Sequence, residues 1–458
     1  MKFDTLDFIS KLVAFESVSA DSSRAGEVRK CAEFLANALN SFGFSAKIVE
    51  TDLHPIIVAE RKSRAQPPKI KIMCYGHYDV QPEDPVEKWS TPPFETVVRD
   101  GKIWGRGTAD NKGPFSCMLA GLLEFFDKHP DAPADFTLVF EGEEEIGSPS
   151  ITKFISDNAD FISQNDILLL SDTSAAAVDQ PVVTVGLRGT ASFEAIFKGP
   201  NTDIHSGMFG GMVYNPLQAM AEVCASLHGA DGLVNIDKFY DGLETLSDWE
   251  RAEIAKSPFG EDEVRAQLGV KKLYVQNGFR PSEAVRVLPT VEFTGMGGGY
   301  QGEGSKSVIP SECFCKISCR TVPLQNTRAV VELVKEAIRS RTPEGVGVSF
   351  IESDSFGDPY FVNPKAVPAD VRGKKTAAVF AAADECAEKC FGRRPIYLRE
   401  GASIPLISTI KRKTGVDSVL FGLFTPADNL HAPNEGFSLK MVENASKYYE
   451  MFFEKIIK

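Results

Sequence analysis

The sequence contains only six histidines, and two of them lie in segments suited to binding a metal ion. His77 lies in Met73-Cys-Tyr-Gly-His-Tyr-Asp79, directly after an apolar run that predicts a strand. His77 and Asp79 are two residues apart, so on extended backbone their side chains project the same way. Asp79 could accept the second ring N–H of His77 and leave the other ring nitrogen for a metal. His431 lies in a polar loop, Leu430-His-Ala-Pro-Asn-Glu435.

Carboxylates occupy comparable places in three other segments. Asp110 lies in the glycine-rich loop Gly105-Arg-Gly-Thr-Ala-Asp-Asn-Lys-Gly113, just before a predicted helix. Glu141-Gly-Glu-Glu-Glu-Ile-Gly-Ser148 follows one apolar strand, and Asp172 directly follows another. The ordinary alternatives are a helix N-cap for Asp110 and a solvated turn for the acidic segment. A phosphate-binding loop is disfavoured, because no third glycine has the required spacing and no GK[ST] follows.

Taken together, histidines and carboxylates recur at the ends of several predicted strands. In an open α/β sheet the carboxyl ends of strands meet at one edge, where ligands bind. Imidazole and carboxylate are the donors that zinc and similar ions accept. Two ions about 3.5–4 Å apart could activate a water and polarise a carbonyl. We expect His54, His129 and His228, by contrast, to be solvated or structural.

The elements that would position these residues follow an α/β pattern at both ends of the chain. Apolar periodicity predicts helices at about 3–13, 24–43 and 112–128, a hairpin at 96–104, and strands at 46–50, 56–60, 70–75, 136–140 and 166–171. The pattern resumes after residue 373, with helices at 374–391, 404–411 and from 437, and strands at 395–398 and 418–421. Strands with both faces apolar favour a mostly parallel sheet flanked by helices.

The middle of the chain has a different order of elements. Strands at 190–198, 290–295, 311–319 and 346–351 and helices at 215–229 and 327–340 give β-α-β-β-α-β, the order of a ferredoxin-like module. A charged segment at about 231–285 is inserted within it. We therefore predict an α/β domain at 1–188 and 361–458, interrupted by a second, α+β domain at 189–360.

Composition narrows the class of protein. The 458 residues carry a formal charge of −13, which argues against binding to nucleic acid or to an anionic membrane. The nine cysteines include no CxxC pair, so buried reduced thiols are expected. Charged residues interrupt the apolar residues at the N-terminus, and no apolar run approaches about 18 residues. These features predict a cytoplasmic protein that does not bind membranes.

The motifs in combination resemble a known family. GHYDVQP, GRGTADNKGP, EGEEEIGS, SDT, GLRG, DIHSGMFGG, SVIP, SCR-x-VP, REGASIP and LHAPNE occur in the order seen in the di-zinc metallopeptidases of the aminoacylase/carboxypeptidase G2 family. The sequence is most similar to the cytosolic non-specific dipeptidase (carnosinase-like) branch. The resemblance covers nearly the whole chain and implies the same layout, in which 1–188 and 361–458 form the catalytic domain and 189–360 forms a lid and dimerisation domain.

The resemblance implies a role for each residue of the candidate centre. Asp110 would bridge two divalent ions, zinc with manganese or cobalt as alternatives, and the remaining ligands would be His77 and Asp172 for one ion, Glu145 and His431 for the other. Glu144 would be the general base, taking a proton from the bridging water and giving it to the leaving amine. Asp79 would orient His77. A cis peptide bond is implied between Asp110 and Asn111.

The resemblance also implies substrate contacts and a partner subunit. His205, in DIHSGM, would reach the active site of the partner in a homodimer and stabilise the oxyanion. Arg320 would pair with the C-terminal carboxylate of the substrate, for which the fork of a guanidinium is suited. Ser307 and Ser403 occupy matching substrate-contact positions. The expected substrate is a small peptide or an N-acyl amino acid.

The expected reaction is hydrolysis of a dipeptide amide by a metal-bridging hydroxide. An N-acyl amino-acid deacylase or a carboxypeptidase on the same centre is the alternative, and a non-catalytic metal-binding or interaction protein is a third. Two departures from the family pattern stand out. No histidine occurs between Arg320 and His431, so the substrate contacts of residues 359–372 are open. Glu143 is expected to add acidity near the metal ions.

Overall fold

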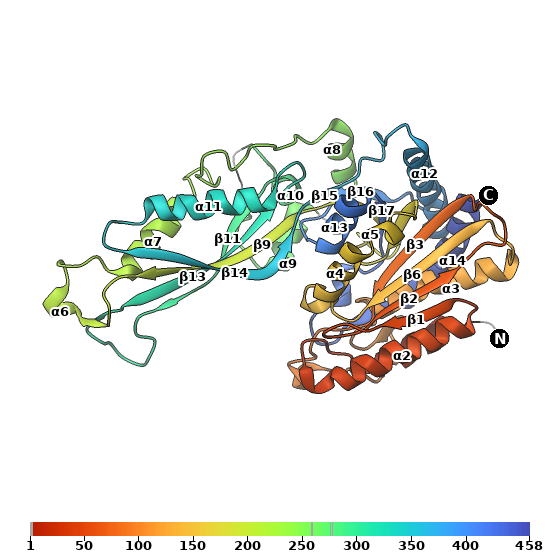
Figure 1. The fold of residues 1–458 in the computed structure, drawn as a ribbon, viewed down its shortest axis with the longest axis horizontal. Helices are drawn as coiled ribbons and strands as arrows, with labels where there is room; N and C mark the ends of the chain where they lie inside the picture. Colours follow the sequence, from red (N-terminus) through yellow and green to blue (C-terminus); the bar gives the residue numbers. More distant parts are fainter. Residues whose placement is uncertain (1–2, 258–259, 275, 277) are drawn as a thin grey trace.

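The computed structural model describes residues 3–257, 260–274, 276 and 278–458, and Figure 1 shows two lobes. The larger lobe combines the N-terminal part of the chain, in red to yellow, with the C-terminal part, in blue. The sheet changes between Leu187 and Gly189 and again between Gly357 and Tyr360. The domain boundaries at 188/189 and 360/361 stay predictions. Residues 258, 259, 275 and 277 of the charged segment lie outside the described residues.

A nine-stranded sheet forms the larger lobe, with the order β1-β2-β6-β3-β7-β17-β8-β15 and with β16 paired to β8. The strands are β1 (Ser45–Val49), β2 (Ile56–Arg61), β3 (Ile70–His77), β6 (Ala134–Glu141), β7 (Ile167–Leu170), β8 (Val182–Leu187), β15 (Tyr360–Phe361), β16 (Ile396–Arg399) and β17 (Asp417–Gly422). The centre, β6-β3-β7-β17, is parallel. The prediction of a mostly parallel sheet flanked by helices is confirmed.

Helices cover both faces of this sheet, and every residue of β6, β7 and β8 is consequently buried. The helices are α1 (Thr5–Val13), α2 (Ala25–Ser41), α3 (Lys112–Lys128), α4 (Pro149–Asp157), α5 (Ala159–Ile162), α12 (Val371–Phe391), α13 (Pro405–Thr414) and α14 (Leu439–Ile457). Helices α3 and α14 pack so closely that a Cβ at Gly121 would lie 2.5 Å from the Cβ of Tyr449. The last helix is thereby fixed to the helix that follows Asp110.

The smaller lobe has a four-stranded antiparallel sheet with the order β11-β13-β9-β14. Its elements are β9 (Gly189–Lys198), α7 (Pro216–Ser226), β11 (Thr290–Gly298), β13 (Glu312–Thr321), α11 (Thr327–Arg341) and β14 (Gly347–Gly357). Alternate residues of β13 are buried against the two helices, as a strand with one covered face requires. The predicted β-α-β-β-α-β order is confirmed.

Short elements decorate both lobes. In the larger lobe they are the 3-10 helices η1 (Ser22–Arg24), η2 (Val86–Lys88), η3 (Glu144–Ile146) and η4 (Pro426–Asp428) and the small sheet of β4 (Val97–Arg99), β5 (Lys102–Trp104) and β18 (Gly436–Ser438). In the inserted part of the chain they are β10 (Ile204–His205), α6 (Ser206–Phe209), α8 (Asp248–Ile254), α9 (Glu261–Leu268), α10 (Pro281–Val287) and β12 (Val308–Ile309), of which α8 packs on β16 of the larger lobe. The nine cysteines are free, and eight are buried. Within the described ranges, no helix has the length and apolarity needed to cross a membrane.

Candidate metal centre

The five predicted metal ligands come together at the carboxyl edge of the larger sheet. His77 is the last residue of β3, and Asp172 lies two residues beyond β7. Asp110 lies two residues before α3, Glu145 lies in η3 after β6, and His431 lies in the loop between β17 and β18. Because the parallel strands end at this edge, segments far apart in the sequence meet there.

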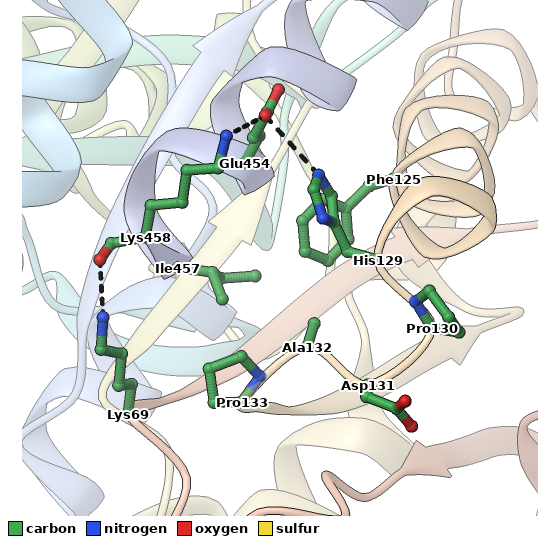
Figure 2. A pocket seen from close by; sticks show the side chains of 10 residues that line it. All are labelled: Lys69, Phe125, His129, Pro130, Asp131, Ala132, Pro133, Glu454, Ile457 and Lys458. Atoms are coloured by element: carbon green, nitrogen blue, oxygen red, sulfur yellow. Dashed lines mark hydrogen bonds and ion pairs between the residues drawn. The ribbon is translucent and has the colours of Figure 1, made fainter.

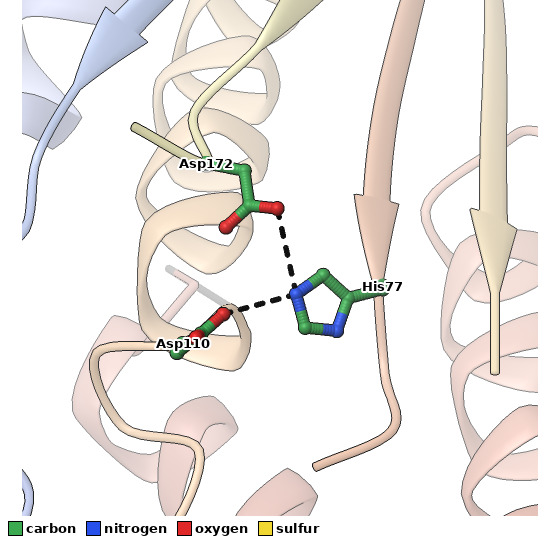
Figure 3. A group of neighbouring side chains, drawn as sticks. All are labelled: His77, Asp110 and Asp172. Carbon is green, nitrogen blue, oxygen red and sulfur yellow. Dashed lines mark hydrogen bonds and ion pairs between the residues drawn. The ribbon is translucent and has the colours of Figure 1, made fainter. Parts of the chain in front are cut away.

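Asp110 lies between two groups of potential ligands. On one side, His77 Nε2 is 3.1 Å from Asp110 Oδ1 and 3.6 Å from Asp172 Oδ2 (Figure 3). On the other side, His431 Nε2 is 2.9 Å from Asp110 Oδ2 and 3.3 Å from Glu145 Oε2. Each oxygen of Asp110 therefore faces a different histidine, which is the arrangement expected of a carboxylate shared by two ions.

The donor set of each group fits a zinc-like ion. Both groups have one imidazole and two carboxylates, and the donor atoms of each group lie within 4.8 Å of one another. Donor atoms at about 2.0–2.2 Å from a tetrahedral ion are themselves about 3.3–3.6 Å apart, close to the spacing found here. With Asp110 shared, each ion would have three protein ligands and an open position, as catalytic zinc sites have.

Electrostatics also indicate a site for cations. Burial raises the pKa of Glu144 well above its usual value, and burial likewise raises the pKa values of Glu145 and Asp172. The hydrogen bonds of His431 to Asp110 and Glu145 raise its pKa to about 10. Without a cation, the centre therefore retains protons at neutral pH. Divalent ions would displace these protons on binding.

Asp79 holds two parts of the centre in place. His77 Nδ1 donates to the backbone oxygen of Asp79 at 3.2 Å and lies 3.3 Å from the Asp79 Oδ1 carboxylate oxygen, so Asp79 holds the ring with Nε2 available to an ion. The same carboxylate accepts the backbone N–H groups of Glu144 (3.2 Å) and Glu145 (3.1 Å). Asp79 therefore contacts the His77 ring, as the His-x-Asp spacing predicts. It also fixes the turn that carries Glu144 and Glu145, which the sequence analysis missed.

Two amide side chains that the sequence analysis missed contact the predicted ligands. Asn111 Nδ2 donates to Asp172 Oδ1 at 3.0 Å. The Asp110–Asn111 peptide bond, which joins Asn111 to the shared ligand, is cis, as the resemblance implies. Gln81 Nε2 donates to Glu145 Oε2 at 2.9 Å. Asn111 leaves Asp172 Oδ2, which lies near His77, free for an ion, whereas Gln81 binds the same oxygen of Glu145 that lies near His431. Their position inside the GHYDVQP and ADNKGP motifs was the available signal.

Glu435, also missed, joins the loop of His431 to the loop of Asp110. Its Oε2 pairs with Arg106 Nη1 at 2.8 Å, and both side chains are 1% exposed. Its two oxygens also accept three backbone N–H groups at 2.9–3.1 Å, those of Gly107, Ala109 and Asp110. Glu435 lies four residues after His431, so one buried carboxylate positions the ligands that face each other across the centre.

Replacing Glu435 with alanine should lower the free energy of unfolding by about 3–5 kcal/mol, because the Arg106 charge would stay buried without its partner. Urea unfolding of metal-free protein measures this change apart from any loss of metal. The control is Glu443→Gln on α14, where the exposed Glu443 pairs with Lys440. A Glu435→Ala protein as stable as this control would contradict the anchoring role.

The carboxylates of the acidic segment do not all face the centre. Glu143 Oε1 accepts the backbone N–H of His54 at 2.7 Å, and its Oε2 accepts that of Ser150 at 2.8 Å. The expectation that Glu143 adds acidity near the metal ions is therefore wrong, because backbone donors bind its buried carboxylate. Glu141 is also buried and accepts from Tyr75 Oη at 2.5 Å, and burial raises its pKa to about 8.

The three histidines that were expected to be solvated or structural lie apart from the centre. His54 Nε2 contacts Ser19 O at 3.1 Å, and His228 packs edge-on against Phe293. His129 lines a hollow of about 470 Å³ at the amino end of β3 and β6, opposite the centre (Figure 2). Its Nε2 is 3.5 Å from Glu454. Neither metal-binding group in the described part of the chain includes these histidines.

The predicted substrate contacts fall into two places. Arg320, at the end of β13, donates from Nη1 to Ser403 Oγ at 2.6 Å, beside the larger lobe. His205 and Ser307 lie together at α6, because Ser206 N donates to Ser307 O at 3.1 Å and His205 pairs with Val308. Figure 1 shows α6 at the end of the smaller lobe that is remote from the larger sheet. The structure does not bring His205 and Ser307 to the metal centre of their own chain.

Comparisons with known proteins agree with this centre. The model of the family described as Peptidase family M20/M25/M40 matches residues 73–455. The chain is 28% identical to the Cys-Gly metallodipeptidase DUG1 of Candida albicans, over 97% of this chain and 94% of that protein. It is 27% identical to the Beta-Ala-His dipeptidase of Homo sapiens, over 87% and 77% of the two chains.

Solved structures resemble the whole chain. An M20 family metallo-carboxypeptidase, Sso-CP2 from Sulfolobus solfataricus, superposes with a TM-score of 0.85 at 26% identity, covering 99% of each chain. The di-peptidase Dug1p of Saccharomyces cerevisiae superposes with a TM-score of 0.80 at 26% identity, covering 99% of this chain and 95% of the other. Both lobes therefore have counterparts in these proteins.

Proposed function

The chain belongs to peptidase family M20/M25/M40, and from this we propose that it is a metal-dependent hydrolase that cleaves the amide bond of dipeptides. Relatives named as dipeptidases match along nearly its whole length, which supports the substrate class. The observation that carries the proposal is the position of Asp110, whose two oxygens face His77 and His431. That arrangement suits a pair of ions beside one general base.

In the proposed mechanism the chain supplies both the ligands and the base. Two divalent ions, zinc with manganese or cobalt as alternatives, would lower the pKa of a water and polarise the scissile carbonyl. His77 and Asp172 would hold one ion, Glu145 and His431 the other, and Asp110 both. Glu144 has its pKa raised well above the usual value by burial, which suits a group that takes a proton from water and returns it to the leaving amine.

Other residues would bind the substrate. The Arg320 guanidinium, held by Ser403, would pair with the C-terminal carboxylate of the dipeptide. We propose that His205 stabilises the oxyanion in the active site of a second subunit of a homodimer, with Ser307 beside it. The position of His205 and Ser307 at the tip of the smaller lobe supports action in a partner rather than in their own chain.

An N-acyl amino-acid deacylase or a carboxypeptidase is the second candidate. It is favoured by the structural similarity to Sso-CP2, which is described as a metallo-carboxypeptidase. Kinetics with free dipeptides, N-acetylated dipeptides and longer peptides would separate the candidates. Preference for free dipeptides supports the proposal, whereas preference for acylated or longer substrates supports the alternative.

Removing the metal should abolish hydrolysis of free dipeptides, and adding Zn²⁺ or Mn²⁺ should restore it. The apparent affinity for Zn²⁺ should rise between pH 6 and pH 8, because His431, whose pKa is about 10 without metal, must lose its proton to bind an ion. Titration of metal-free protein with Zn²⁺, alongside activity measurements, tests both expectations. Full activity in a strong chelator, or hydrolysis of no dipeptide by metal-loaded protein, would overturn the proposal.

A further inference from the structure

A cavity of about 400 Å³ lies between the smaller sheet and α10. Its lining residues include Arg188, Arg320, Glu292, Ser318, Thr290 and Thr294. Most of these side chains come from the face of β11 and β13 that α7 and α11 leave uncovered. The cavity thus combines two guanidinium groups, hydroxyl groups and one carboxylate with the apolar side chains of Pro281, Ala284 and Val285 on α10.

The loop after β16 places the two arginines side by side. Arg188 donates from Nε to Gly401 O at 2.7 Å and from its backbone N to Ala402 O at 3.0 Å. Arg320 donates to Ser403, two residues along the same loop, and pairs in register with Thr190 of β9. A Cβ at Gly401 would lie 3.3 Å from Arg188 Nη2, so glycine lets this guanidinium lie against the loop.

Neither guanidinium has a counter-ion in the described part of the chain. Arg188 and Arg320 are half-buried and form no ion pair there, whereas the buried Arg106 and Arg399 pair with carboxylates at 2.8 Å and 2.7 Å. Burial and the neighbouring Arg320 charge lower the pKa of Arg188 to about 10, and the charge of the exposed Glu292 opposes this shift without forming an ion pair. Two adjacent unpaired cations cost free energy that a bound anion would offset.

The acidic side chains nearby leave room for such an anion. Glu292 lines the cavity but is exposed and makes no ion pair within the described ranges. Glu400 accepts from Ser174 Oγ at 2.8 Å, and the charge of Arg286 partly offsets the rise in the pKa of Glu400 that burial causes. The Nη atoms of Arg188, which have no hydrogen-bond partner among the described residues, stay free for a ligand.

A series of contacts connects the metal centre to the loop that holds the two arginines. Ser174 follows the predicted ligand Asp172 by two residues and donates to Glu400, and the next residue, Gly401, accepts from Arg188. A dipeptide with its scissile bond at the ions and its C-terminal carboxylate on Arg320 would direct its C-terminal side chain towards this cavity.

We propose that the cavity binds the side-chain carboxylate of an acidic C-terminal residue, with Arg188 pairing to it while Arg320 holds the main-chain carboxylate. The substrate class is then dipeptides that end in aspartate or glutamate. The assignment rests on the proposed function, because it requires Arg320 to bind the C-terminal main-chain carboxylate of the substrate. Arg188 is the specificity-determining residue, and its free Nη edge offers a two-point contact to a carboxylate.

The test compares substrates that differ only in charge. The wild-type kcat/KM should be about tenfold or more higher for Ala-Asp than for Ala-Asn, and for Ala-Glu than for Ala-Gln. This ratio should fall at high ionic strength, since the cavity is open to solvent. Arg188→Gln should bring the ratio close to unity, and Arg188→Lys should retain part of it. Glu292→Gln, which removes the competing carboxylate, should raise it.

An equal rate for acidic and amide substrates in the wild-type enzyme would overturn the inference without any variant. A ratio of acidic to amide substrates that is unchanged in a folded, metal-loaded Arg188→Gln protein would also overturn it. If Arg188→Gln does not fold, Glu292→Gln is tested instead, and a ratio that does not rise in that variant contradicts the inference. If no dipeptide is cleaved, the proposed function fails, and calorimetric titration with glutarate and butyrate then tests the cavity alone. Tighter binding of the dicarboxylate supports the anion site, and equal binding contradicts it.

Discussion

Replacing Glu144 with glutamine should lower kcat by about 10²- to 10⁴-fold while both metal positions stay filled. Glu144 lies beside the predicted ligand Glu145 in η3, and burial raises its pKa well above the usual value. It is absent from both groups of potential ligands, so removing its charge should leave the donor atoms in place. Turnover of a free dipeptide and metal content by elemental analysis measure the two effects.

The matched control is Glu143→Gln, one residue earlier in the acidic segment. Glu143 binds the backbone N–H groups of His54 and Ser150, so this change should reduce stability and leave kcat of the folded protein within a few-fold. If Glu144→Gln turned over dipeptides at a near-normal rate, Glu144 could not be the general base. If it lost metal as well as activity, its role would be in binding the ions.

The candidate centre could be predicted from the sequence because its residues follow strands with strong local patterns. The apolar runs of β3 and β6 locate His77 and Glu145 at strand ends, and the His-x-Asp spacing predicts the contact of His77 with Asp79. The direction of individual side chains was harder to predict from the sequence. Glu143 and Glu144 are adjacent in a run of acids, and only the tertiary structure shows that backbone donors surround Glu143.

The features that were missed depend on contacts between distant parts of the chain. Glu435 binds Gly107 and Asp110 across more than 320 residues, and no local pattern marks it as their anchor. Strand β8 was missed although it pairs with β17, because its six residues run almost directly into β9 and have no turn signal between them. In both cases the C-terminal segment completes a structure that the N-terminal segment begins.

Because the smaller lobe is inserted in the larger one, one chain could contribute residues to two active sites. The larger lobe contains the candidate ligands, whereas the smaller lobe carries Arg320 near the junction and His205 at its far end. His205 Nδ1 accepts from Gly207 N at 3.0 Å, which fixes the ring and leaves Nε2 for another group. Met208 and Met212, beside it, are 68% and 76% exposed, a surface consistent with contact to a second subunit.

Replacing His205 with alanine should lower kcat by about 10²- to 10³-fold, the usual cost of removing an oxyanion donor. The decisive experiment mixes this variant with Glu144→Gln, since each is inactive alone. In a mixed dimer, the His205→Ala subunit retains Glu144 and would receive His205 from its partner. If subunits pair at random, half of the dimers are mixed, and each mixed dimer has one intact site out of two. Activity should therefore recover to about a quarter of wild type.

A mixture that stays inactive would show that His205 acts in its own chain or not at all, provided that subunits exchange. Exchange can be verified with differently tagged subunits and tandem purification of the mixed dimer. The control pairs Glu144→Gln with Asp110→Asn, two changes in the same candidate centre of one chain. No mixed dimer then has an intact site, so activity should not recover. Recovery in the His205 pairing, set against that control, would assign the oxyanion donor to the partner subunit and make the dimer the catalytic unit.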